Sequence, residues 1–203
     1  MRYITLKSLK SKASKIIILL VIIFLTIPSA YSQAYRPRNR YIQGSYSLLK
    51  TEYDNQTYNS DYAFSLGAGR TFFFHKQAIY DNFWIGLDWM VLDFSLAHFE
   101  KDIEANLVKF NQMEAGTHVG PSFWYSPVKG ISLNYYFRFA PTLSRIKFKD
   151  SSTKLNEYAQ YWVTGASFSY KIFAFGLEYK WGGYNKSNVK TNGPRFYLGV
   201  RLW

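Results

Sequence analysis

The chain has no cysteine in its 203 residues and few acidic residues, 13 against 25 Lys and Arg. Without cysteine there is no disulfide framework and no residue for lipid attachment. No HExxH, P-loop, GxSxG or Cys/His metal spacing occurs, so no catalytic residue, cofactor or metal ligand is predicted. The basic residues form no Lys/Arg-rich run, which argues against a nucleic-acid partner.

An apolar run long enough to span a membrane as a helix is also missing. Ile16–Ile27 is almost wholly apolar but has twelve residues, against roughly 20 for a spanning helix. Five basic residues precede it, and the small residues Ala30 and Ser32 follow it. This order predicts a cleaved secretory signal peptide, residues 1–32, with cleavage after Ala34 as the alternative. A retained anchor helix is the competing interpretation.

Removing residues 1–32 leaves 20 basic and 13 acidic residues, a net charge of +7. Anionic lipid headgroups or sugars are the natural partners for this charge. Aromatic residues are abundant at 20% of the chain, with 18 Tyr and 17 Phe. A transmembrane β-barrel uses such residues on its lipid-facing surface and in two interfacial girdles.

After a lead-in at residues 33–40, apolar and polar residues alternate with the period of two that is typical of strands. A reversal of this phase near Met90 and Val91 predicts a β-bulge. The chain ends in a strand whose last residue is Trp203, as expected where a final strand pairs with the first. The expected strands are 41–53, 62–74, 83–99, 110–125, a strand from 131, 157–172, 173–181 and 195–203.

The connections are expected to alternate, long after the first, third, fifth and seventh strands and short after the others. Bacterial outer-membrane barrels have short periplasmic turns and longer outside loops. The prediction is therefore an all-β protein, an eight-stranded antiparallel up-and-down transmembrane β-barrel at residues 41–203. Both termini would lie in the periplasm, with the long loops extracellular.

The two faces of the strands differ, because one carries large aromatic residues and the other small or polar ones. An eight-stranded lumen is only wide enough for side chains, so the polar face is expected inside. A lipocalin-like soluble barrel or a sandwich, the alternative fold, has the opposite polarity. The predicted lumen network is Asp88, Glu114, His118, Arg138, Glu178, Lys180 and Arg201. The predicted lipid-facing residues are Phe64, Leu87, Phe137, Phe139, Phe168, Phe175, Leu198 and Val200.

The inward charges have two interpretations, a catalytic or conducting lumen and a plug of ion pairs. The plug is favoured, because an unpaired buried charge is costly. Pairing the strands about the turn Ser126–Gly130 places Glu114 opposite Thr142 and predicts a diagonal contact between Glu114 and Arg138.

The histidines are His75, His98 and His118. His98 and Ser95 are the one candidate pair for catalysis near the rim. Residues three apart in a strand point to opposite faces unless a bulge intervenes, so this geometry is poor for a nucleophile and its base. The protein is therefore predicted not to be an enzyme.

The signal peptide, the eight-strand pattern and the terminal segment Tyr197–Trp203 resemble the small outer-membrane β-barrel proteins of OmpA/OmpX-like architecture. The segments Tyr41–Gly44 and Phe175–Gly182 are similar to those of uncharacterised Bacteroidetes barrels. In that family the terminal aromatic shares the lipid-facing phase, whereas Trp203 is out of phase with Leu202. The resemblance implies a Gram-negative outer-membrane protein whose partners are lipid, lipopolysaccharide and the barrel-insertion machinery.

Three functions remain open. The main prediction is a non-catalytic structural or binding protein that acts through its extracellular loops, with an envelope or extracellular partner. The alternatives are a component of an envelope assembly, such as secretion or conjugation machinery, and a lipid A-modifying enzyme.

Overall fold

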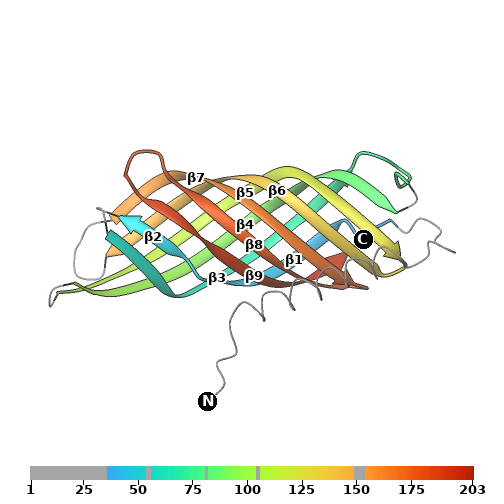
Figure 1. Ribbon diagram of the computed structural model, residues 1–203. Coiled ribbons are helices and arrows are strands. Elements are labelled where there is room, and N and C mark those ends of the chain that lie inside the picture. Colours follow the sequence, from blue (N-terminus) through green and yellow to red (C-terminus); the bar gives the residue numbers. More distant parts are fainter. Residues whose placement is uncertain (1–35, 54–55, 81, 104–105, 149–153) are drawn as a thin grey trace, which may run out of the picture. The chain divides into compact units, whose positions relative to one another are not determined.

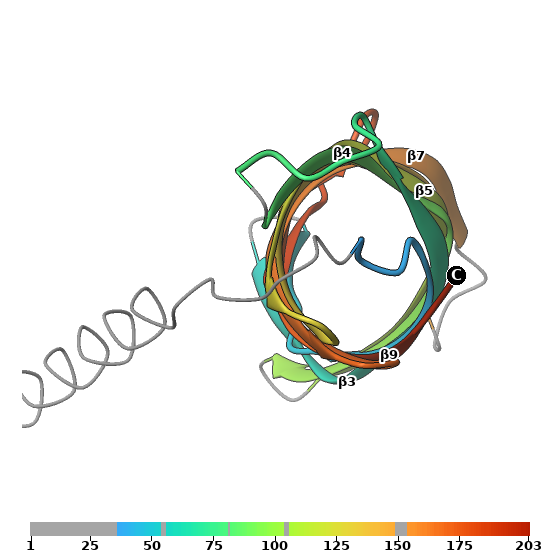
Figure 2. The ribbon, with the colours of Figure 1, turned by 90° about the vertical axis from the view of Figure 1, so that its right-hand side faces the viewer.

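The computed structural model describes residues 36–53, 56–80, 82–103, 106–148 and 154–203. The predicted signal peptide, residues 1–32, lies outside the described residues. No helix in the described part of the chain is long and apolar enough to cross a membrane. One antiparallel sheet closes on itself (Figures 1 and 2). Its strands are β1 (Arg40–Ser47), β2 (Lys50–Tyr53), β3 (Gln56–Phe73), β4 (Phe83–Ile103), β5 (Asn106–Val128), β6 (Ile131–Phe148), β7 (Lys154–Tyr170), β8 (Phe173–Tyr184) and β9 (Lys190–Leu202).

β1 and β2 are two parts of one barrel strand, because both pair with β3 on one side and with β9 on the other. The ring therefore has eight strands, which confirms the predicted fold class. The pairs from Arg40↔Leu202 to Ser47↔Arg195 close it. β1 begins and β9 ends at the same end of the barrel, here called the terminal end; the opposite end is the distal end (Figure 1).

Trp203 lies just beyond β9 at the terminal end and is 61% exposed. Its ring lies 5.2 Å from the guanidinium carbon of Arg38, which belongs to the lead-in. The alternation along β9 would place Trp203 on the inward side of the strand. Trp203 comes after the last residue of β9, however, and its side chain is exposed.

The predicted β-bulge near Met90 and Val91 is confirmed. β3 pairs Ala68 with Leu92 and then Gly69 with Met90, so Val91 is the extra residue. An extra residue reverses the phase of the strand. As a result Asp88 and Asp93 both point into the barrel although they are five residues apart.

The predicted alternation of long and short connections is wrong. At the distal end the strands are separated by residues 54–55, 104–105, 149–153 and 185–189, and at the terminal end by 74–82, 129–130 and 171–172. Segments expected as polar loops continue the ladder instead, as in the pairs Glu100↔Lys109 and Lys50↔Asn59. The longest connection thus lies at the terminal end.

These extended distal segments reverse the polarity of the barrel wall. Along most of the barrel the outward residues are apolar and the inward ones polar. Beyond His98, the inward Phe99 and Phe110 are buried, while the outward Glu100 and Lys109 are polar. The distal interior is an apolar cluster made of Leu49, Tyr58, Ala63, Ala97, Phe99, Phe110, Ala140, Ile146, Ala159, Tyr161, Val163, Tyr184 and Val189. This cluster is called the distal cap.

Candidate functional site: the lumen and the outer wall

The middle of the lumen holds equal numbers of buried acidic groups and fixed cations. All are 6% exposed or less. Burying one such charge without a partner costs several kcal/mol, so their pairing decides whether the lumen is stable. The carboxylates are Asp88, Asp93, Glu114 and Glu178, and the cations are Arg138, Lys180, Arg195 and Arg201.

Arg138 is at the centre of the first cluster. Its Nε lies 2.7 Å from Oδ2 of Asp88 and its Nη1 lies 3.2 Å from Oε1 of Glu178. Asp88 also accepts hydrogen bonds from the Tyr41 hydroxyl at 3.0 Å and the Thr71 hydroxyl at 2.7 Å. One guanidinium therefore joins carboxylates from β4 and β8 across the lumen.

Arg195 connects this cluster to a second one. Its Nη1 lies 2.9 Å from Oδ2 of Asp93 and 3.5 Å from Oε2 of Glu178. Nε2 of His118 is 3.2 Å from the same Asp93 oxygen. Neither Asp93 nor Arg195 was among the predicted lumen residues. Arg195 shares the phase of Arg201, and Asp93 lies on the polar side of the strand after the predicted bulge, so the alternation could have identified both.

The third cluster is built on Glu114, which forms an ion pair with Lys180. Glu114 also accepts hydrogen bonds from the Tyr161 hydroxyl at 2.6 Å and from Nε2 of Gln112 at 2.8 Å. A further hydrogen bond, of 3.1 Å, comes from the hydroxyl of Ser95. Every hydrogen-bonding partner of this carboxylate is thus a side chain inside the barrel.

The predicted contact between Glu114 and Arg138 is wrong. Glu114 pairs with Ser144 and not with Thr142, because the turn is only residues 129–130 and Tyr125 pairs with Leu133 instead of lying near Ile131. The two side chains therefore belong to different clusters.

Arg201 is held by aromatic rings. Its guanidinium carbon lies 4.3 Å from the ring centre of Trp124 and 5.1 Å from that of Tyr41. Such cation–π contacts strengthen when water is excluded. At the same end Phe73 packs on Trp84, with ring centres 5.5 Å apart.

Large aromatic residues do fit inside, contrary to the expectation that the lumen takes only small and polar ones. Inward glycines make the space. A Cβ at Gly165 would lie 2.6 Å from the Tyr136 hydroxyl, and one at Gly176 would lie 2.5 Å from the Tyr197 ring. Tyr136 then reaches Glu178 with a hydrogen bond of 2.7 Å. The glycines therefore leave space on the inward side that the tyrosine rings occupy.

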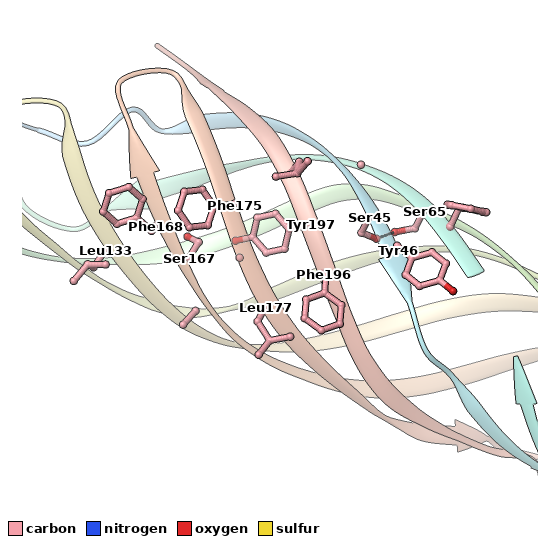
Figure 3. Close-up of a pocket in the computed structure, with 15 residues that line it drawn as sticks. Ser45, Tyr46, Ser65, Leu133, Ser167, Phe168, Phe175, Leu177, Phe196 and Tyr197 are labelled. Carbon is pink, nitrogen blue, oxygen red and sulfur yellow. Dashed lines mark hydrogen bonds between the residues drawn. The ribbon is translucent and has the colours of Figure 1, made fainter. Parts of the chain in front are cut away.

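The residues predicted to face lipid all lie on the outward phase of their strands, and Leu198 is 72% exposed. An apolar groove of about 920 Å³ lies on this outer wall across β6, β7, β8, β9, β1 and β3. Figure 3 shows the residues that line it. Gly44 pairs with Leu66 and Leu198 and leaves open space between them, which deepens the groove. Its outward side chains include Tyr46, Phe64, Phe168, Phe175, Leu177 and Phe196.

Ser95 and His98 lie on opposite faces of β4. Ser95 points inward to Glu114, whereas the His98 ring stacks on Tyr62 with ring centres 5.2 Å apart. His98 Nδ1 is 2.6 Å from Oδ1 of Asn111. The pair therefore forms no nucleophile–base contact.

A group that the sequence reasoning missed lies beside His98. A bulge between Ser60 and Tyr62 brings Asp61 to the outer face, so that ligand atoms of Asp61, His98 and Glu100 lie within 4.8 Å of one another. The Lys109 ammonium, 2.8 Å from Glu100, lowers the pKa of that carboxyl and neutralises its charge. Glu100 is thus already paired with a cation.

No protein-family model and no curated protein sequence matches this chain. Among solved structures, it is similar to Ail, the attachment invasion locus protein of Yersinia pestis, in complex with the heparin analogue sucrose octasulfate. That likeness has 15% identity and a TM-score of 0.53, and covers 82% of this chain and 100% of the other. Neisserial surface protein A gives 13% identity and a TM-score of 0.53, covering 83% and 100%. The chain has the fold of the small outer-membrane β-barrels. At these identities the likeness concerns the fold and not the activity.

Proposed function

We propose that this protein is an outer-membrane β-barrel with a sealed lumen, and that it acts without catalysis through its outward surface at the distal end. Residues 1–32 are its signal peptide, 33–40 its periplasmic lead-in and 41–203 its barrel. The observation that carries the proposal is the content of the lumen. Four carboxylates and four fixed cations are buried together there, and the distal cap lies on their distal side.

The outward apolar band supports placement in a membrane. On β6 it runs from Ile131 to Leu143, and the outward Arg145 and Lys147 follow. At 3.3 Å per residue this is about 40 Å along the strand. At a tilt of about 40° it becomes about 30 Å along the barrel axis, close to the apolar height of outer-membrane barrels. Lipid and lipopolysaccharide are therefore the proposed surroundings, reached with the help of the barrel-insertion machinery.

The distal surface is the part proposed to bind a partner. Its outward side chains include several cations, which suit the phosphates of lipopolysaccharide or other anionic sugars. The reversed polarity of the distal segments supports their exposure to water. The similarity to Bacteroidetes barrels and the alternative role in an envelope assembly stay predictions from the sequence. These distal outward cations are Lys50, Lys109, Arg145, Lys147 and Lys190.

Conductance tests the sealed lumen. The purified barrel in a planar bilayer is expected to give no stable conducting state, because side chains occupy the lumen and every carboxylate in it is paired. A porin in the same bilayer provides the positive control. Regular channel steps that scale with the amount of inserted barrel would contradict a sealed lumen.

Accessibility on intact cells tests the orientation. A tag inserted at Asn188, or at residue 151 in the β6–β7 connection, is expected to bind antibody on whole cells. A tag at Lys129, in a terminal-end turn, is expected to bind only after the outer membrane is permeabilised. Labelling of the Lys129 tag on intact cells would reverse the proposed orientation.

A further inference from the structure

Two turns at the terminal end are joined into one surface. The backbone N–H of Lys171, in the β7–β8 turn, donates a 2.6 Å hydrogen bond to the carbonyl of Gly130 in the β5–β6 turn. The N–H of Arg201 donates a bond of 2.6 Å to the carbonyl of Ile172. Turns that are far apart in the sequence are thus held in a fixed relation to β9.

A cavity of about 640 Å³ opens on this surface. Cations come to it from three separate segments: Arg38 from the lead-in, Lys129 and Lys171 from the two turns. No acidic residue lines it, and none of the ion pairs found among the described residues involves these cations. Three cations therefore line the cavity, and no Asp or Glu side chain of the described residues lines it with them.

The rest of the cavity wall is apolar. Tyr170 and Phe173 face outward, and Phe173 is 62% exposed. The Lys171 ammonium lies 5.3 Å from the centre of the Tyr170 ring. The cationic corner is therefore continuous with the outward apolar band, which begins at these residues.

The backbone of Lys171 is strained. Its φ is +52°, in the left-handed region that favours glycine. The turn beside it has a glycine, Gly130, at its own left-handed position, with φ +88°. Glycine would adopt this backbone conformation with less strain than lysine. The lysine therefore points to a functional role for its side chain, since backbone strain is concentrated at functional positions.

We propose that this terminal-end cavity binds the headgroup of an anionic glycerophospholipid. The phosphate is held by Arg38, Lys129 and Lys171, and an acyl chain lies along Tyr170 and Phe173. A ligand with a negative head and an apolar tail matches both parts of the cavity. The inference rests on the proposed function, in which the outward band faces lipid.

The test uses the purified full-length mature protein and phosphatidylglycerol, with phosphatidylcholine as the uncharged-head comparison. Retained lipid is measured by native mass spectrometry, and affinity by titration of labelled phosphatidylglycerol at low salt. Lys129→Gln and Lys171→Gln are each expected to weaken phosphatidylglycerol binding about fivefold. Lys76→Gln, which removes an exposed cation from the connection between β3 and β4 at the same end but outside the cavity, is the matched control and is expected to leave binding unchanged.

Lys171→Gly separates the role of the side chain from that of the turn. This variant removes the strain, so resistance to unfolding is expected to rise or stay equal, while phosphatidylglycerol binding falls as in Lys171→Gln. Unchanged binding in Lys171→Gly would overturn the inference. A barrel that inserts into phosphatidylcholine vesicles but shows no preference for phosphatidylglycerol also refutes it and leaves the proposed function standing. Failure to insert into either lipid refutes the proposed function.

Discussion

Replacing Arg138 by methionine is expected to lower the free energy of unfolding by about 3–5 kcal/mol. Methionine keeps the apolar stem but leaves Asp88 and Glu178 without the guanidinium that joins them. Both carboxylates stay buried, since Asp88 is 0% exposed and Glu178 is 1% exposed. Urea unfolding of the barrel in lipid vesicles, followed by tryptophan fluorescence, measures the change.

The matched control is Arg145→Met on the same strand. Arg145 is outward and exposed, and it pairs across strands with Met113 and Asn156. Its removal is expected to change the free energy of unfolding by about 0.5 kcal/mol or less, as for most surface substitutions. If both variants cost the same small amount, the inward charges are solvated and the sealed lumen is wrong.

The pair Glu114 and Lys180 is expected to be strongly coupled. Glu114→Gln and Lys180→Met each leave one buried charge alone, so each is expected to cost about 3 kcal/mol or more. The double variant leaves neither charge, and its cost is expected to be below the sum of the single costs by about 1–3 kcal/mol. A double-mutant cycle on refolding stability in vesicles gives this coupling directly.

A second cycle on Glu114 and Arg138 is the comparison, because these residues belong to different clusters. Its coupling is expected to be smaller than that of Glu114 with Lys180. Additive costs in the first cycle would mean that water separates the charges, as in a conducting pore. A larger coupling in the second cycle would support the register that the structure excludes.

Several features followed from the sequence because the physical rule involved is local. Alternation with a period of two identified the eight strands, since side chains in a strand point to opposite faces whatever the strand pairs with. The same rule located the bulge at Val91, where the phase reverses. It also placed Ser95 and His98 on opposite faces.

The lengths of the strands were not predicted, although a signal for them exists. Segments rich in charge, such as Glu100–Lys109, suggested loops. In this segment and at its two ends, the inward Phe99, Val108 and Phe110 alternate with the outward polar residues Glu100 and Lys109, which is the pattern of a strand with the reverse polarity. The interpretation as loops assumed that apolar residues face outward along the whole barrel, and this holds only along the outward apolar band.

The sequence by itself identified six of the eight fixed charges of the lumen and the side of each strand that they occupy, but Asp93 and Arg195 were missed. Only the tertiary structure decided which of these charges form ion pairs with one another. A shift of one inward position in the β5–β6 register moves Glu114 from Thr142 to Ser144. Closure of the ring then brings β8 across from β5, so that Lys180 and not Arg138 reaches Glu114. Register depends on turn geometry and on packing around the whole ring, and a pattern along one strand carries no information about either.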